Sequence, residues 1–137
     1  MSRSNYNDDC DGWARICWRG AVTKAMKGKR GQALLKDLVA ALDAMPEKRL
    51  IADELVDPNG ESCALGVLGM VRQMPNLAQL NPDDTKTVAS KFNVAEALVR
   101  EITYMNDEGH CWREETPEHR WQRMRSWVER QIIKATP

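Results

Sequence analysis

The sequence has no long hydrophobic run and no excess of charge. No segment approaches the ~18 consecutive apolar residues of a membrane span, and residues 1–9 lack the apolar stretch of a signal peptide. The 20 basic and 20 acidic side chains cancel, so the net charge gives no general attraction to nucleic acid or to a membrane surface. We therefore expect a cytoplasmic protein that binds no membrane.

Paired metal-ligand spacings, internal repeats and low-complexity segments are missing too. The four cysteines stand at irregular positions, with no Cys-x-x-Cys among Cys10, Cys17, Cys63 and Cys111. In a reducing compartment this pattern favours free, mostly buried thiols over disulfides. A chain of 137 residues is long enough to bury a core without a disulfide or a metal. We expect neither a metal nor a cofactor.

Helical periodicity dominates what is present. Hydrophobic residues make up 42% and charged residues 29% of the chain, which is typical of a soluble globular protein. Apolar residues recur at helical spacing in five or six segments. The sequence predicts a mostly α, compact single domain of five to six helices over residues 10–134, preceded by a disordered polar tail at residues 1–9.

Turn and capping residues mark the helix boundaries. Gly28-Lys29-Arg30-Gly31 predicts a loop between the first two helices, and Pro46 ends the second. Asn81-Pro82 predicts a helix start, with Asn81 as the capping residue and the proline in the first turn. A break at Phe92-Asn93 and a start at Thr116-Pro117 delimit the last helices.

The middle of the chain combines a turn with a glycine-bearing helix. Asp57-Pro58-Asn59-Gly60 is typical of a tight turn, so the sequence predicts a small β-hairpin near residues 54–63. Gly66 and Gly69 follow in a predicted helix, where each costs about 1 kcal/mol relative to alanine. A neighbouring backbone that comes very close would require them, which predicts a central position for this helix.

Basic side chains are concentrated in the first predicted helix. Residues 15–30 contain six basic residues and no acidic one. The run could form a positive patch for phosphate or for an acidic partner. We favour the other interpretation, a solvated helix face whose last lysines complement the helix dipole.

Two of the five tryptophans bear on function. Trp18 and Trp127 project away from the narrowest apolar stripes of the first and last helices. If exposed among arginines, they would form a surface of the kind enriched at protein interfaces, whereas a wider core stripe would bury them. The predicted partner-binding surface consists of Arg15, Trp18, Arg19, Lys27, Arg30, Arg123, Trp127 and Arg130.

Residues 87–102 have the shape of a helix-turn-helix motif, because Ala89 is small and Asn93 tolerates the left-handed backbone of such a turn. The outward positions of the second helix include two acids and one base among Ala95, Glu96, Ala97, Arg100 and Glu101. Such a helix is a poor match for phosphates and base edges. A DNA-binding regulator is therefore the alternative hypothesis.

A second unusual stretch runs from Asn106 to Cys111. Asn106 and Asp107 can cap a helix end, with Gly109 as the left-handed residue, and we favour this interpretation. The alternative places Asp107, His110 and Cys111 near Cys63 as a metal or nucleophile site. The lack of a paired-ligand spacing weighs against that alternative.

The pattern Gly60-x-x-Cys63-Ala-Leu-Gly66, the later Asn106-Asp107 pair and a Thr-Pro-led last helix resemble a set of small uncharacterised proteins of bacteria, prophages and phages. The resemblance covers roughly residues 31–132, with Val67 where alanine is expected. It implies a phage or bacterial accessory protein and nothing about catalysis. We expect a non-enzymatic protein that binds an unidentified protein partner, as a modulator or inhibitor of a host or phage complex.

Overall fold

The computed structural model describes residues 12–109 and 114–134, with side chains from Trp18 onward. It is mostly helical and forms one compact domain, as the sequence predicts. The elements are α1 (Gly12–Lys27), α2 (Lys29–Ala44), α3 (Ala64–Val71), the short 3-10 helix η1 (Leu77–Gln79), α4 (Thr85–Phe92), α5 (Glu96–Glu108) and α6 (Pro117–Gln131). The predicted tail at residues 1–9 lies outside the described residues.

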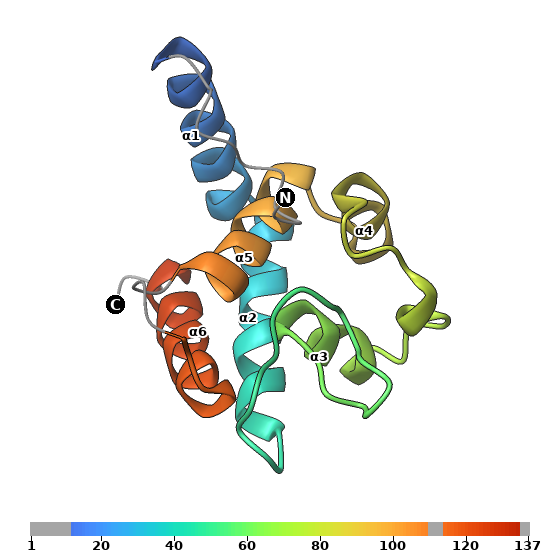
Figure 1. Cartoon of the computed structure of the whole chain (residues 1–137). Helices are drawn as coiled ribbons and strands as arrows, with labels where there is room; N and C mark the ends of the chain where they lie inside the picture. The colour runs from blue at the N-terminus through green and yellow to red at the C-terminus, as the bar shows by residue number, and fades with distance from the viewer. Residues whose placement is uncertain (1–11, 110–113, 135–137) are drawn as a thin grey trace.

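Two helices, α2 and α5, hold the others together. In Figure 1, α2 runs through the middle of the molecule between α6 and α3, and α5 crosses in front of it. α5 packs against α1, α3, α4 and α6, while α2 packs against α1, α3 and α6. The fully buried side chains of the core include Leu34, Leu35, Leu38 and Leu42 of α2, and Leu98 and Ile102 of α5. α1 projects from the top of this assembly.

The prediction of a loop at residues 28–31 is wrong, because Gly28 alone separates α1 from α2. The N–H of Gly28 donates to the carbonyl of Lys24 at 3.0 Å, and its own carbonyl accepts from Gln32 at 2.9 Å. A Cβ on Gly31 would stand 1.9 Å from the carbonyl oxygen of Ala25. Gly31 therefore permits the close approach of two helices and does not form a loop. Pro46 follows the end of α2, as predicted.

The β-hairpin predicted near residues 54–63 is also wrong. Only one isolated antiparallel bridge, between Val56 and Ser62, occurs there, and no strand is found in the described parts of the chain. The predicted turn itself is present, since the Asp57 carboxylate accepts from the N–H groups of Asn59 and Glu61 at 2.9 Å each. Strand pairing stops short because Asp53 has a left-handed backbone, with φ of 70°, which interrupts the extended run.

Helix α3 is fixed in place by a cysteine cap and a glycine. The Cys63 Sγ accepts from the N–H of Gly66 at 3.4 Å. A Cβ on Gly66 would stand 1.9 Å from the carbonyl oxygen of Leu55, so the predicted close approach of a neighbouring backbone is confirmed there. At Gly69 the close neighbour is a side chain, because a Cβ there would stand 2.8 Å from a methyl carbon of Leu77.

Of the boundaries predicted for the last three helices, one is wrong and two are confirmed. α4 begins at Thr85, three residues later than Asn81-Pro82 predicts, because Asp84 is the cap and accepts from the Thr87 N–H at 3.2 Å. The predicted break is confirmed, since Asn93 has a left-handed φ of 57°. The start of α6 is confirmed as well, with the Thr116 hydroxyl accepting from His119 N–H at 3.1 Å. None of the described helices has the length and apolarity to cross a membrane.

Replacing Gly66 with alanine should destabilise the fold by about 3 kcal/mol, because the added methyl group meets backbone that cannot rotate away. The matched control is Gly20→Ala in α1, where a Cβ has no neighbour within 4 Å. That control should be neutral or stabilising by up to about 1 kcal/mol. Urea unfolding followed by circular dichroism measures both changes. Equal unfolding midpoints for the two variants would contradict the close approach at Gly66.

Candidate functional site

Asn106 lies at the centre of the buried polar groups and is 1% exposed. Its side-chain oxygen accepts from the N–H of Ala64, the first residue of α3, at 3.1 Å. Its side-chain nitrogen donates to the carbonyl of Ile51 at 2.9 Å. One amide thus connects α5 both to α3 and to the irregular segment before it.

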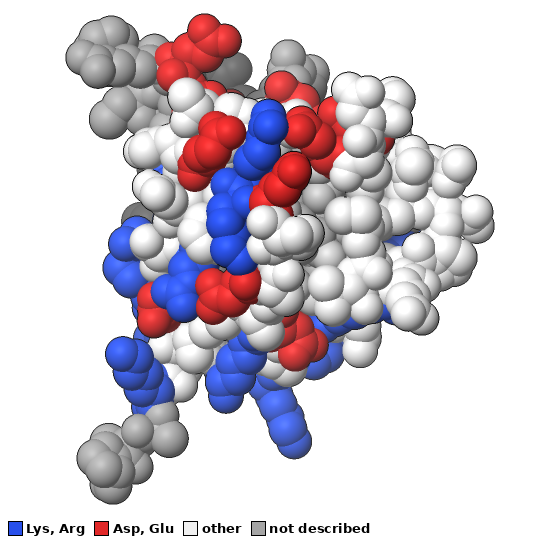
Figure 2. All heavy atoms as spheres, turned by 90° about the horizontal axis from the view of Figure 1, so that it is seen from below, with Lys and Arg blue, Asp and Glu red and all other residues white. Residues whose placement is uncertain are grey.

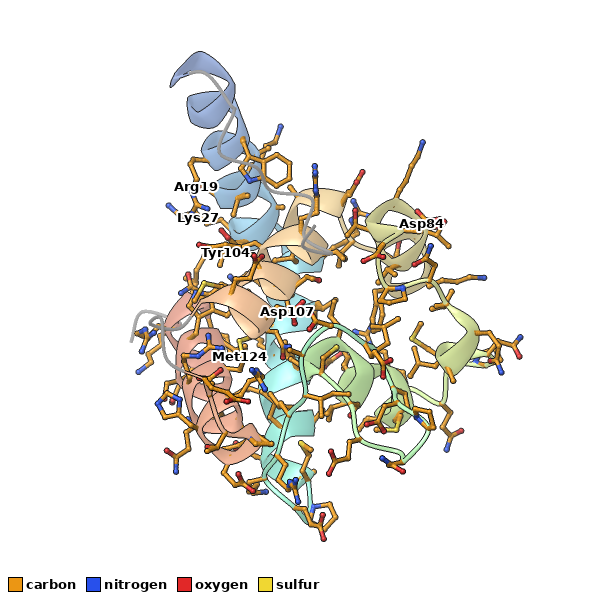
Figure 3. The ribbon with its side chains drawn as sticks, in the orientation of Figure 1. Arg19, Lys27, Asp84, Tyr104, Asp107 and Met124 are labelled. Atoms are coloured by element: carbon orange, nitrogen blue, oxygen red, sulfur yellow. The ribbon has the colours of Figure 1, made fainter. Side chains whose placement is uncertain are left out.

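Asp107 extends the same connection. Its Oδ1 accepts from the Asn106 side-chain amide at 2.8 Å and from the N–H of Asp53 at 3.2 Å. The second bond holds the residue that has the left-handed backbone. Figure 3 shows Asp107 in the middle of the molecule, between α5 and α3. This carboxylate therefore acts as a backbone clamp.

Two arginines of α6 bind the carbonyl groups at the end of α5. Arg120, which is 8% exposed, donates from Nε to the Asn106 carbonyl at 3.0 Å and from Nη1 to the Leu50 carbonyl at 3.3 Å. Arg123 donates to the same Asn106 carbonyl at 3.1 Å and makes a short hydrogen bond to the carbonyl of Met105. These contacts satisfy carbonyl groups that the helix end leaves unpaired.

Glu115 balances the charge of both arginines, with a side chain that is only 1% exposed. Its carboxylate lies 3.2 Å from Nε of Arg120 and 2.7 Å from Nε of Arg123. Burial alone would raise the pKa of Glu115, but hydrogen bonds from Arg123 and His119 and the charges of both arginines lower it from 4.5 to about 2. We did not predict this network, whose only sequence signal is an acid just before the Thr116 cap followed by arginines at positions 120 and 123.

Cys63 and Asp107, the two described members of the alternative metal or nucleophile site, both have structural roles. Cys63 is 1% exposed, and its sulfur caps α3. Asp107 is bound to backbone and to Asn106, and His110 and Cys111 lie outside the described residues. Within residues 12–109 and 114–134, no group of three or more His, Cys, Asp or Glu side chains could hold a metal ion. Cys63 and Asp107 hold the fold together. The favoured interpretation of the stretch at residues 106–111 is wrong, because Asn106 and Asp107 lie inside α5 and Gly109, with φ of −76°, is not left-handed.

The predicted partner-binding surface does not form as a single patch. Trp127 is 8% exposed and belongs to the core, so the interpretation of a wider core stripe is confirmed for this residue. Trp18 is half-buried, with the guanidinium of Arg100 over its ring at 4.7 Å from the centroid. Arg19 is bound to the buried Glu101 of α5. The stripe of core residues is wider on both helices than the sequence pattern indicates.

The remaining members of that surface are separated. Lys27 and Arg130 are exposed, and Arg30 donates to the carbonyl of Asn93 at 3.4 Å. Figure 3 shows Lys27 and Arg19 on the same outer side of α1. The Arg15 side chain lies outside the described residues, and Arg123 is occupied at the end of α5.

The basic residues near position 30 have a structural explanation, because three helix C-termini meet at the start of α2. The Gln32 side-chain amide donates to the carbonyl of Met26 at 2.7 Å and to that of Gln131 at 3.0 Å, at the ends of α1 and α6. Arg30 contacts the end of α4 at Asn93. Helix C-termini carry partial negative charge that cations stabilise. This geometry agrees with the interpretation of the lysines as dipole complements.

The helical corner of α4 and α5 offers little surface to DNA. α5 would have to enter a groove, yet it packs against four other helices, and its residue Glu101 is 4% exposed. Arg100 is half-buried and stacked on Trp18. A recognition helix needs a free face for base edges and phosphates. This packing weighs against the DNA-binding alternative.

A surface between α2 and α3 is the most distinctive feature outside the core. A hollow of about 420 Å³ lies there, lined by Ala41, Ala44, Met45, Pro46, Glu47, Arg49, Gly60, Glu61, Ser62, Val67, Met70 and Val71. A second hollow of about 350 Å³ adjoins it, lined by Asp37, Ala40, Ala41, Ala44, Leu68, Val71 and Arg72. Val71 lines both hollows and is 59% exposed, and Met70 beside it is 44% exposed. The lining of both hollows is mainly apolar.

This surface continues onto a segment without charge. Arg72 is the only charged residue from Ser62 to Pro82. Figure 2 shows the right-hand half of the molecule, seen from below, with almost no charged side chains, in contrast to its left half. We call the exposed part of α3 and the following segment, residues 70–81, the uncharged face, in which Arg72 is the single charge. The walls of the two hollows opposite α3 carry further charges, at Asp37, Glu47, Arg49 and Glu61. Sequence reasoning missed the uncharged face because an apolar helix is expected to be buried on all sides.

Comparisons of the chain with protein-family models, with curated proteins and with solved structures gave no match. The functional assignment therefore depends on the geometry of the chain itself. That geometry consists of a buried polar network that fixes the fold and an uncharged face beside it. The first binds backbone, and the second exposes the apolar side chains of Met70 and Val71.

Replacing Asn106 with aspartate should destabilise the protein by about 3 kcal/mol at neutral pH. The variant has no donor for the Ile51 carbonyl and adds a second buried carboxylate beside Asp107. Asn76→Asp is the control, because Asn76 is exposed and its side chain makes no capping hydrogen bond. Thermal and urea unfolding should separate the two variants. An unchanged unfolding midpoint for Asn106→Asp would contradict the role of the Asn106 amide in connecting α5 to Ile51 and α3.

Acid should weaken the attachment of α6 through Glu115. Since the folded protein holds the pKa of Glu115 near 2, below its usual 4.5, this group stabilises the fold above about pH 4.5 and loses that contribution as the pH falls toward 2. Glu115→Gln should cost about 2 kcal/mol at pH 7 and flatten the decline in stability between pH 4.5 and 2. The exposed Glu114→Gln should retain the decline of the wild type. A Glu115→Gln profile parallel to wild type over this range would contradict the assignment.

Proposed function

We propose that this chain is a non-enzymatic accessory protein, of phage or bacterial type and acting in the cytoplasm, that binds protein through the uncharged face. It would work as a modulator or inhibitor of a host or phage complex. The observation that carries this proposal is the pair of exposed apolar side chains, Met70 and Val71, beside two apolar hollows.

The composition of α3 supports protein binding. Its sequence, Ala-Leu-Gly-Val-Leu-Gly-Met-Val, has no polar side chain. A helix that is apolar on every side is normally covered on every side. Residues 64–69 are buried, whereas Met70 and Val71 emerge onto the surface. A partner that covers them would complete the burial that this composition favours.

The lack of charge supports it as well. The central part of a protein interface is depleted of charged residues, because each charge removed from water carries a desolvation cost. The chain from Gln73 to Pro82 carries no charge. Elsewhere exposed charges are frequent, and pairs such as Arg125–Asp43 lie on other faces.

A non-enzymatic role is supported by three potentially reactive side chains that the structure describes, because each of them has a structural role. The Cys63 thiol caps α3, and the Asp107 carboxylate holds backbone. Glu115 is paired with two arginines. Each of these groups is bound to the protein itself, and none of them lines either hollow.

Val71→Lys should abolish protein capture by the uncharged face, because it places a charge between the two hollows. The matched control is Ile133→Lys, since Ile133 is 54% exposed and Val71 is 59% exposed. Both exposed positions should change stability by less than about 0.5 kcal/mol. Immobilised wild type, Val71→Lys and Ile133→Lys would be incubated with a bacterial lysate that also contains an untagged copy of the chain.

We expect wild type and Ile133→Lys to retain the same protein, and Val71→Lys to retain at least about tenfold less, a loss of the size seen when an interface centre is disrupted. Quantitative mass spectrometry of the retained proteins gives the ratio. Equal retention by all three proteins, or no retained protein with wild type, would refute the proposal.

A further inference from the structure

The uncharged face forms a ridge beside the two hollows. Val71 stands between two hollows, and Met70 lies next to it on the same helix end. Methionine adapts its shape to irregular apolar gaps. A surface that carries an apolar projection beside an apolar recess can fit a two-fold related copy of itself, with the ridge of each copy in the hollow of the other.

Charge at the rim has the same self-complementary character. Asp37 of α2 and Arg72 at the end of α3 form an exposed pair at 3.0 Å, and both line the smaller hollow. A two-fold axis that brings Arg72 of one copy toward Asp37 of the other brings the reverse pair together as well. In such a dimer, Arg72 and Asp37 of each copy would face Asp37 and Arg72 of the other.

The chain as a whole does not repel its own copies. It carries 20 basic and 20 acidic side chains, so its net charge is zero. A net charge near zero favours association, whereas a large net charge keeps copies apart. The charges that line the two hollows have both signs, with Arg49 and Arg72 against Asp37, Glu47 and Glu61. A partner of one strong sign would therefore meet like charges as well as opposite ones.

From these observations we infer that the occupant of the uncharged face is a second copy of this chain, in a two-fold symmetric dimer with Val71 at its centre. The inference rests on the proposed function, because it names the protein that the face binds. The dimer would be the unit that acts on a host or phage complex.

Sedimentation velocity of the purified full chain tests this directly. Wild type and Ile133→Lys should sediment at twice the chain mass of 15.6 kDa at high concentration and dissociate on dilution. Val71→Lys should raise the dissociation constant at least about tenfold, because burying its ammonium group at the centre is unfavourable. A wild type that stays monomeric at the highest concentration, or a Val71→Lys variant that dimerises as wild type does, overturns the inference.

A charge exchange between copies distinguishes the symmetric contact from a merely structural role of the rim pair. Asp37→Arg and Arg72→Asp should each weaken self-association, because like charges then meet across the axis. An equimolar mixture of the two variants should recover the dimer, since each copy now supplies the opposite sign to the other. An effect on folding within each chain would not be repaired by mixing. A mixture that remains as monomeric as its components overturns the two-fold contact.

The two proposals can fail separately. A purified chain that stays monomeric but retains a foreign protein in a Val71-dependent way overturns the second copy as occupant and supports protein binding. A chain that neither self-associates nor retains any protein overturns both. Circular dichroism of each variant, compared with wild type, establishes that loss of association is not loss of folding.

Discussion

The fold depends on the amide and carbonyl of Asn106. The segment from Leu50 to Cys63 has almost no regular secondary structure, so its backbone groups need partners from elsewhere. The Asn106 side chain supplies one of them, at Ile51, and it also accepts from Ala64, the first residue of α3. The Asn106 carbonyl accepts from two arginines of α6. One residue of α5 thereby positions an irregular segment, the start of α3 and one side of α6.

This arrangement determines where α3 lies and why its end is exposed. The start of α3 is held from inside by Asn106 and by the Cys63 cap, and Gly66 lets the Leu55 carbonyl approach its backbone. None of these contacts lies on the outer side of the helix. α3 can therefore keep its position while Met70 and Val71 remain uncovered, which a helix held only by packing on all sides could not do.

Local signals in the sequence were sufficient for most helix boundaries and insufficient where distant residues decide. The Thr116-Pro117 start and the left-handed turn at Asn93 follow from the chemistry of those residues. The left-handed backbone of Asp53, directly before the predicted hairpin, was not foreseen, and its N–H is bound by Asp107, 54 positions away. The exposure of Val71 was equally hidden, since apolarity predicts burial and only the packed structure shows what covers a helix.

The distribution of charge then separates the two candidate surfaces. At the junction of α1, α4 and α6, Arg30 and the side-chain amide of Gln32 donate to carbonyl groups at helix ends, and this internal requirement accounts for their presence. The exposed side chains of the uncharged face have no such internal role, because buried groups, Asn106 and Cys63, bind the N–H groups at the start of α3. Apolar side chains exposed without an internal reason are the stronger indication of a partner. The exposed end of α3 and the segment after it carry one charge, Arg72, and that charge is paired with Asp37 at the edge of the surface.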